Sequence, residues 1–203
     1  MNTMKYSLKL MVVLIMLATP SLGFADYQDG KNAFDRMDYS TALREFKLLA
    51  ERNDPLGQYG LGVMYDIGEG VPQSSSKAAK WYKLAASQGN ADAQNNLGAM
   101  YEAGEGVPHD SKEAIRWYRL AAEGGNFNAP NNLGAIYLSG IEVPRSRVQA
   151  YMWFNIAIQR KDRAAEKNMK FIKPKMYAEQ ILTAERMAHQ WMLIYQNKWK
   201  RLR

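Results

Sequence analysis

Apolar residues recur along most of the chain at spacings of three and four, which places them on one face of an α-helix. The pattern stops at glycine and proline and resumes after a short polar stretch. Each new stretch opens on a serine, aspartate or asparagine, whose side-chain oxygen can accept a hydrogen bond from the free N–H groups of a helix start. The pattern predicts a series of short helices and no β-strand.

The helical pattern repeats every 36 residues, because residues 55–90, 91–126 and 127–162 align without gaps. Nine columns are identical in all three segments: Leu61/Leu97/Leu133, Gly62/Gly98/Gly134, Tyr65/Tyr101/Tyr137, Gly68/Gly104/Gly140, Val71/Val107/Val143, Pro72/Pro108/Pro144, Ala78/Ala114/Ala150, Trp81/Trp117/Trp153 and Ala85/Ala121/Ala157. Such a period is the signature of one structural unit used repeatedly.

Each unit predicts a hairpin of two helices, called here helix A and helix B. Helix A starts after an Asx column (Asp54/Asn90/Asn126) and ends at a glycine column (Gly68/Gly104/Gly140). Helix B starts after Ser74/Asp110/Ser146 and buries the Ala, Trp, aromatic and Ala columns. Glycine at Gly62 costs about 1 kcal/mol of helix propensity relative to alanine. We therefore expect a neighbouring helix to lie too close to Gly62 for a side chain.

Partial units flank the three repeats. Residues 39–52 predict a lone B helix that follows a short helix at about 27–36, and residues 163–172 predict a lone A helix that ends before Pro174. Residues 176–197 carry one apolar face and predict a capping helix. The chain is therefore expected to be all-α, with ten helices.

The repeated motif L-G-x-x-Y-x-x-G-x-G-V-x-x-(D/S)-x-x-x-A-x-x-W-Y-x-x-A-A resembles the Sel-one-like repeat, a relative of the tetratricopeptide repeat. The resemblance covers residues 38–172 and implies a right-handed α-solenoid of stacked helical hairpins with a protein-interaction role. The third repeat departs from the motif at Pro130, Glu142 and Arg160-Lys161, so its turns are expected to differ. The family's cysteine-rich branch joins each hairpin with a disulfide, and this chain contains no cysteine.

The N-terminus predicts a signal peptide. Residues 1–9 carry Lys5 and Lys9 without an acidic residue, residues 10–18 are all apolar, and Gly23 and Ala25 are small residues at the −3 and −1 positions of a cleavage site. Nine apolar residues fall short of the about 20 that span a bilayer as a helix. We expect cleavage after Ala25, a mature chain without a transmembrane span, and a periplasmic or secreted protein, with an uncleaved anchor or a buried core helix as the alternatives. The organisation expected along the chain is a signal peptide (1–25), N-terminal capping helices and a half repeat (26–54), three repeats (55–90, 91–126 and 127–162), and a half repeat with a basic C-terminal capping helix (163–203).

Candidate chemistry is sparse. The absence of cysteine excludes thiolate sites, and two histidines exclude a three-histidine metal centre. Ser74-x-x-Lys77 matches one serine β-lactamase motif but has no K-T-G or S-D-N partner, and Ser74 falls in a helix-cap column. His109 and His189 are interpreted as solvated or locally bonded. No catalytic residue, metal or cofactor is expected.

Charge is divided unevenly along the chain. Residues 26–158 carry 13 basic and 16 acidic residues, whereas residues 159–203 carry 12 basic and 4 acidic. A basic cluster around an aromatic residue favours contact with an anionic envelope surface, and a solvated tail is the alternative. That cluster consists of Lys198, Trp199, Lys200 and Arg201. Nucleic acid is not an expected partner of an exported protein.

Solenoids bind partners along an extended concave stripe. The helical wheel places three helix-A columns opposite the packed face, and they supply the candidate partner-binding residues Tyr59, Val63, Asp66, Asn95, Glu102, Asn131 and Leu138. The leading hypothesis is a non-catalytic exported adaptor for a protein, peptide or envelope partner. The alternatives are a cell-wall or lactam ligand-binding protein with weak hydrolase activity and a structural spacer in an envelope complex.

Overall fold

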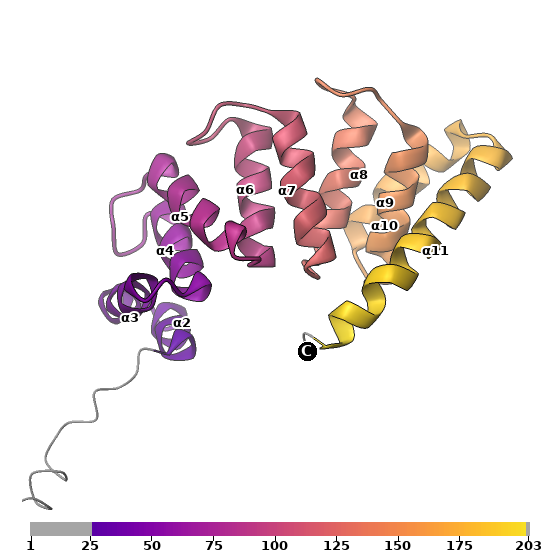
Figure 1. Cartoon of the computed structure of the whole chain (residues 1–203). Helices are drawn as coiled ribbons and strands as arrows, with labels where there is room; N and C mark the ends of the chain where they lie inside the picture. Colours follow the sequence, from indigo (N-terminus) through magenta and orange to yellow (C-terminus); the bar gives the residue numbers. More distant parts are fainter. Residues whose placement is uncertain (1–25, 202–203) are drawn as a thin grey trace, which may run out of the picture.

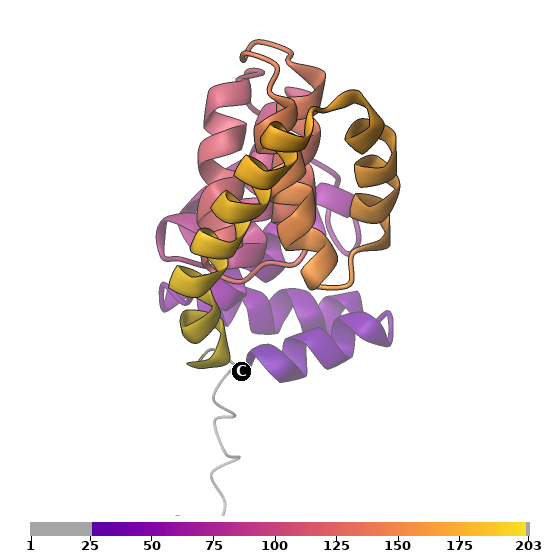
Figure 2. The ribbon, with the colours of Figure 1, turned by 90° about the vertical axis from the view of Figure 1, so that its right-hand side faces the viewer.

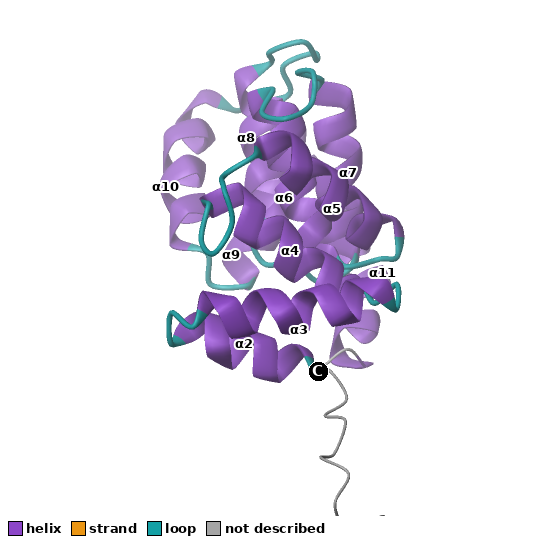
Figure 3. Cartoon of the chain, turned by 90° about the vertical axis from the view of Figure 1, so that its left-hand side faces the viewer, coloured by secondary structure: helices purple, strands orange, loops and turns teal. Residues whose placement is uncertain are grey.

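The computed structural model describes residues 26–201, and it describes side chains as far as Tyr195. The segment interpreted as a signal peptide, residues 1–25, lies outside this part. Within the described part the chain is entirely helical, with loops between the helices and no strand (Figure 3). The α-helices are α2 (Tyr27–Asp35), α3 (Tyr39–Glu51), α4 (Pro55–Ile67), α5 (Ser75–Ser87), α6 (Ala91–Ala103), α7 (Ser111–Glu123), α8 (Ala129–Ser139), α9 (Arg147–Gln159), α10 (Arg163–Ile172) and α11 (Ala178–Arg201). A 3₁₀ turn, Lys173–Lys175, separates the last two.

The hairpins stack into an arc, with α2 and α3 at one end and α10 and α11 at the other (Figure 1). Each A helix (α4, α6, α8) packs on its own B helix (α5, α7, α9) and on the B helix of the preceding hairpin. Successive A helices also contact one another directly, as α4 does α6 and α8 does α10. Neighbours are closest on the inside of a curved stack, so the A helices form the inner face. The α-solenoid expected from the repeats is confirmed.

The helix boundaries follow the cap residues. Asp54 and Asn90 accept backbone N–H groups at the starts of α4 and α6, and Ser74, Asp110 and Ser146 do so for the B helices. Gly68 and Gly104 end α4 and α6 in the left-handed region, at φ +81° and +72°. These local signals were sufficient to place both ends of most helices.

The glycine of each A helix lies under an aromatic ring of its B helix. A Cβ atom on Gly62 would lie 2.5 Å from the Tyr82 ring, and one on Gly98 would lie 2.8 Å from the Tyr118 ring. Gly134 meets the ring of Phe154 in the same way. The expected close approach is confirmed, and the aromatic side chain of helix B makes it.

The third repeat keeps its turns and changes a helix start. Glu142 and Lys161 adopt left-handed φ angles of +57° and +68°, so the expected difference at these two turns was wrong. Hydrogen bonds accompany these conformations, which glycine would adopt more readily. The Glu142 carboxylate accepts the Ser111 N–H, and the Lys161 N–H donates to the Ile158 carbonyl oxygen. Helix α8, in contrast, starts at Ala129, two residues later than expected. A proline disfavours helical geometry in the residue before it, except at the start of a helix. Pro130 occupies the second position of α8, which explains why this helix starts later than expected.

Helix α11 extends to Arg201, beyond the end expected near residue 197. It lies across α9 (Figures 1 and 2), burying Ala184 and Ala188. The basic cluster therefore belongs to the last turns of α11 rather than to a tail beyond the helix; it consists of Lys198, Trp199, Lys200 and Arg201. The side chains of the cluster lie outside the described residues. None of the described helices has the length and apolar character needed to cross a membrane.

Candidate partner-binding surface

One column of the expected stripe is bonded to the hairpin's own B helix. The Tyr82 hydroxyl donates to Asp66 at 3.1 Å, and the Tyr118 hydroxyl donates to Glu102 at 2.7 Å. In the third repeat the same column holds Leu138, which packs against the core. Asp66, Glu102 and Leu138 thus join the two helices of their hairpins.

The tyrosines of these pairs remain hydrogen-bond donors over the ordinary pH range. Burial raises the pKa of Tyr82 and Tyr118, and the adjacent carboxylates of Asp66 and Glu102 raise it further. A protonated phenol donates and a carboxylate accepts, so each pair is complementary. The arrangement joins the two helices of each hairpin.

A second expected column lies between successive A helices. The Asn132 amide donates to Asn95 Oδ1 at 3.1 Å, and the Asn168 amide donates to Asn131 Oδ1 at 3.2 Å. Asn95 is only 9% exposed, so the expectation that it points away from packed surfaces was wrong. Tyr59 takes this place in the first repeat, where its ring lies 6.0 Å from that of Tyr82 and burial raises its pKa to about 12.

Only the third expected column faces the open inner surface. Val63 and Ala135 are half-buried there and Ala99 is exposed. The sequence reasoning missed the residues beside them, because an A helix touches its own B helix, the preceding B helix and adjacent A helices, so its buried arc is wider than one face. The exposed or half-buried residues at neighbouring positions of the A helices and of α10 are Leu56, Ile67, Asp92, Asn96, Asn128, Asn132, Asn168 and Phe171. Asparagine at 96, 132 and 168, one per repeat period, was the available signal.

The inner surface contains an open hollow of about 390 Å³ where the third repeat meets α10. The Arg160 guanidinium lies 4.1 Å from the centre of the Phe127 ring and donates to the carbonyl oxygens of Asn126 and Gly125. The lining is mostly polar and consists of Phe127, Asn128, Asn131, Asn132, Arg160, Lys161, Asp162 and Ala164. Its amides and charged groups are suited to peptide backbone or a polar side chain.

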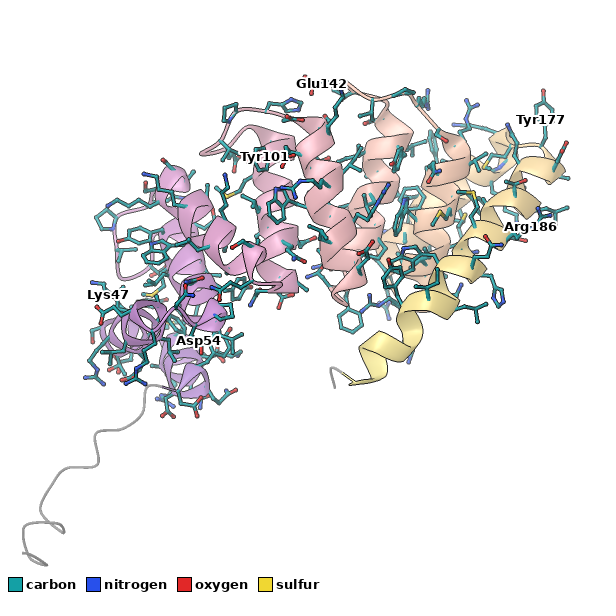
Figure 4. The ribbon with its side chains drawn as sticks, viewed as in Figure 1. Lys47, Asp54, Tyr101, Glu142, Tyr177 and Arg186 are labelled. Atoms are coloured by element: carbon teal, nitrogen blue, oxygen red, sulfur yellow. The ribbon has the colours of Figure 1, made fainter. Side chains whose placement is uncertain are left out.

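The other candidate groups serve the fold. Ser74 accepts the Lys77 backbone N–H at 3.4 Å, which is the helix-cap role that its column indicated. His109 Nδ1 lies 3.2 Å from Glu142, whose carboxylate also accepts the Ser111 N–H at 3.3 Å. Glu142 stands on the loop between α8 and α9, so it connects that loop with the loop before α7 (Figure 4). Within residues 26–201, no group of three metal-ligating side chains is close enough to hold an ion.

Comparison with known proteins identifies the repeated unit. The family model of the Sel1 repeat matches residues 55–90, 91–126 and 129–162. A protective antigen of uropathogenic Escherichia coli strains that displays an SLR fold is 32% identical, with a TM-score of 0.72 over 81% of this chain and 35% of the antigen. A Sel1 repeat protein from Oxalobacter formigenes is 31% identical, with a TM-score of 0.67 over 72% of this chain and 60% of that protein. No curated protein matches the chain.

Proposed function

Because the chain belongs to the Sel1 repeat family, whose repeats generally mediate protein–protein interaction, we propose that it is an exported, non-catalytic adaptor. Its inner face binds an extended segment of a partner protein or peptide. The chain spans 35% and 60% of the length of the two similar solved proteins, so the partner is inferred from this chain's own surface.

The observation that carries this proposal is the row of asparagines on the inner face. Asn132 and Asn168 each use an amide N–H to reach the preceding repeat, which leaves a second N–H and further acceptor capacity for a ligand. Ala99 and Ala135 have small side chains, so the backbone of a partner peptide can approach the inner face beside these asparagines. Packed helices lie about 10 Å apart, a distance that about three residues of extended peptide span. One asparagine amide per repeat can therefore bind every third peptide group.

Apolar side chains flank this polar row at both ends. Leu56 and Ile67 are 40% and 50% exposed on α4, and Phe171 is 57% exposed on α10. Fully burying an exposed aliphatic or aromatic side chain contributes about 1.5–3 kcal/mol, so covering these half-exposed side chains contributes about half as much each. The preferred partner segment therefore carries apolar residues at its ends and presents its backbone to the middle of the inner face.

The test is affinity capture from envelope extract with the wild type and an Ala99→Arg variant. Ala99 is exposed on the inner face, so arginine there blocks the groove without entering the core. The matched control is Ala178→Arg, the same change at an exposed position in the first turn of α11. Partners lost by the first variant and kept by the second support the proposal, provided that both variants are folded by circular dichroism. A partner that binds both variants equally does not use the inner face.

The basic C-terminal cluster is proposed to contact an anionic envelope surface. Removal of residues 197–203 deletes four basic residues, Lys198, Lys200, Arg201 and Arg203. Electrostatic binding weakens as the Debye length falls from about 10 Å at 0.1 M salt to about 3 Å at 1 M. Sedimentation with anionic vesicles should decrease with truncation and with salt. Equal sedimentation of both proteins at low salt would assign the cluster no role in surface binding.

A further inference from the structure

The tryptophan column of the B helices is covered differently in each repeat. Trp153 is 2% exposed under α11, and Trp117 is 5% exposed with the Arg116 guanidinium 4.1 Å from its ring centre. Trp81 is only half-buried and borders an open hollow of about 270 Å³ between α3, α4 and α5. The first repeat therefore leaves open a place that the third repeat fills.

The two places have the same chemistry. The hollow is lined by Lys47, Ala50, Glu51, Leu61, Tyr65 and Trp81. The residues two periods later are Arg119, Ala122, Glu123, Leu133, Tyr137 and Trp153, so every position keeps its type. The middle repeat breaks this match, because Ser87 replaces the glutamate. The first and third repeats thus share one site design.

In the third repeat this site is occupied by α11 of the same chain. The Trp191 ring meets Trp153 edge to face, with centroids 5.3 Å apart and planes at 71°. Tyr195, four residues later, lies 4.6 Å from Trp191. Burial raises the pKa of Tyr195, and the charge of Glu123 and a hydrogen bond with it raise it further. The occupant is thus a helix with a tryptophan and a tyrosine at positions i and i+4.

Charge distinguishes the open site from the occupied one. Helix α5 carries exposed Lys77, Lys80 and Lys83 beside Trp81, and the Lys77 ammonium lies 5.1 Å from the centre of the Tyr65 ring. The equivalent positions on α9 are the uncharged Gln149, Met152 and Asn155. Three added positive charges favour an acidic occupant. A second copy's α11 is a poor match, because residues 178–201 carry four basic and two acidic residues.

We propose that the Trp81 hollow binds an acidic helix of a partner protein that presents an aromatic residue and, four positions later, a tyrosine. The aromatic residue packs against Trp81, and the tyrosine hydroxyl donates to Glu51. The site lies between α3, α4 and α5, and its lining includes Lys47 of α3, which Figure 4 labels. It is separate from the inner face and gives the adaptor a second binding surface.

The probe is a peptide with the sequence of residues 184–197 in which Arg186→Glu, His189→Glu and Gln190→Glu make it acidic while Trp191 and Tyr195 are kept. Arg186 is exposed on α11 and points into solvent (Figure 4), as are the other two positions, so these changes spare the packed face. Binding of the labelled peptide to the mature protein is followed by fluorescence anisotropy. Saturable binding below about 1 mM is expected.

Four variants of the protein locate the binding. Glu51→Gln removes the charged acceptor at an exposed position, and we expect peptide affinity to fall about tenfold or more. The control is Glu123→Gln, the same change at the occupied site, which should leave peptide affinity unchanged. Lys80→Glu should also weaken binding, because it reverses one of the three rim charges. The inner-face variant Ala99→Arg should bind the peptide normally, so failure here is distinguishable from failure of the inner-face proposal.

A Tyr195→Phe change in the peptide completes a double-mutant cycle. It should weaken binding to the wild type and have little further effect on Glu51→Gln. No saturable binding, or equal binding to wild type and Glu51→Gln, overturns the proposal. Equal or tighter binding of the unmodified 184–197 peptide also overturns it, and indicates instead that a second copy occupies the hollow.

Discussion

The hydroxyl of Tyr118 donates a 2.7 Å hydrogen bond to the carboxylate of Glu102, across the two helices of the central hairpin. Tyr82 and Asp66 make the same bond in the first hairpin. The third hairpin replaces both partners at once, with Phe154 and Leu138 in their columns. Losing both groups leaves no buried donor unpaired, so the hairpin can use either a polar or an apolar pair.

The pairing predicts a non-additive effect of mutation. Glu102→Leu leaves the buried Tyr118 hydroxyl without its acceptor, which should cost about 1–3 kcal/mol of unfolding free energy. Adding Tyr118→Phe recreates the pair of the third repeat and should recover part of that loss. Urea unfolding of the wild type, both single variants and the double variant measures the coupling. A double variant less stable than either single variant would contradict this account.

The buried tyrosines predict a loss of stability at alkaline pH. An unfolded phenol ionises near pH 10.0, whereas burial raises the pKa of Tyr59 to about 12 and also raises that of Tyr118. The unfolded state therefore releases protons first, so this stabilisation is complete below pH 10 and is lost as the pH rises toward 12. Over this pH range each such tyrosine lowers the free energy of unfolding by up to about 1.4 kcal/mol for every pH unit. Urea midpoints from pH 8 to 11 should fall less steeply for Glu102→Leu/Tyr118→Phe than for the wild type.

Two nearby positions on α6 should differ in how well they tolerate a large charged residue. Asn95 is buried and accepts the Asn132 amide, so Asn95→Arg should lower the unfolding free energy by about 2 kcal/mol or more. Ala99 is exposed, so Ala99→Arg should change it by no more than about 0.5 kcal/mol. Thermal or urea unfolding compares the two. Similar losses at both positions would mean that the inner face is not open at Ala99.

Export predicts a defined mature N-terminus. Cleavage after Ala25 leaves Asp26 as the first residue, and its side chain accepts the Gln28 N–H at 3.0 Å to cap α2. N-terminal sequencing of protein from envelope and cytosolic fractions of the native host tests this expectation. Protein that begins at Met1 in the cytosol would refute export.

The sequence by itself determined the hairpins and their order. A period of 36 residues, the cap side chains such as Asp54 and Ser74, and the glycine columns fix where helices start, stop and cross, because these are interactions within a few residues or within one repeat. A close approach to each of these glycines was likewise expected from its cost in helix propensity, and the structure identified the neighbour as an aromatic ring. The basic C-terminal region was also visible from composition.

Only the tertiary structure decided which side of each A helix stays open. That side depends on how far each hairpin is rotated on the previous one, which is set by packing among three neighbouring helices rather than by the apolar spacing of one. Packing consequently buried Asn95 and placed Trp191 on Trp153 while leaving Trp81 half-buried. Identical columns thus acquired different environments, because each repeat has different neighbours.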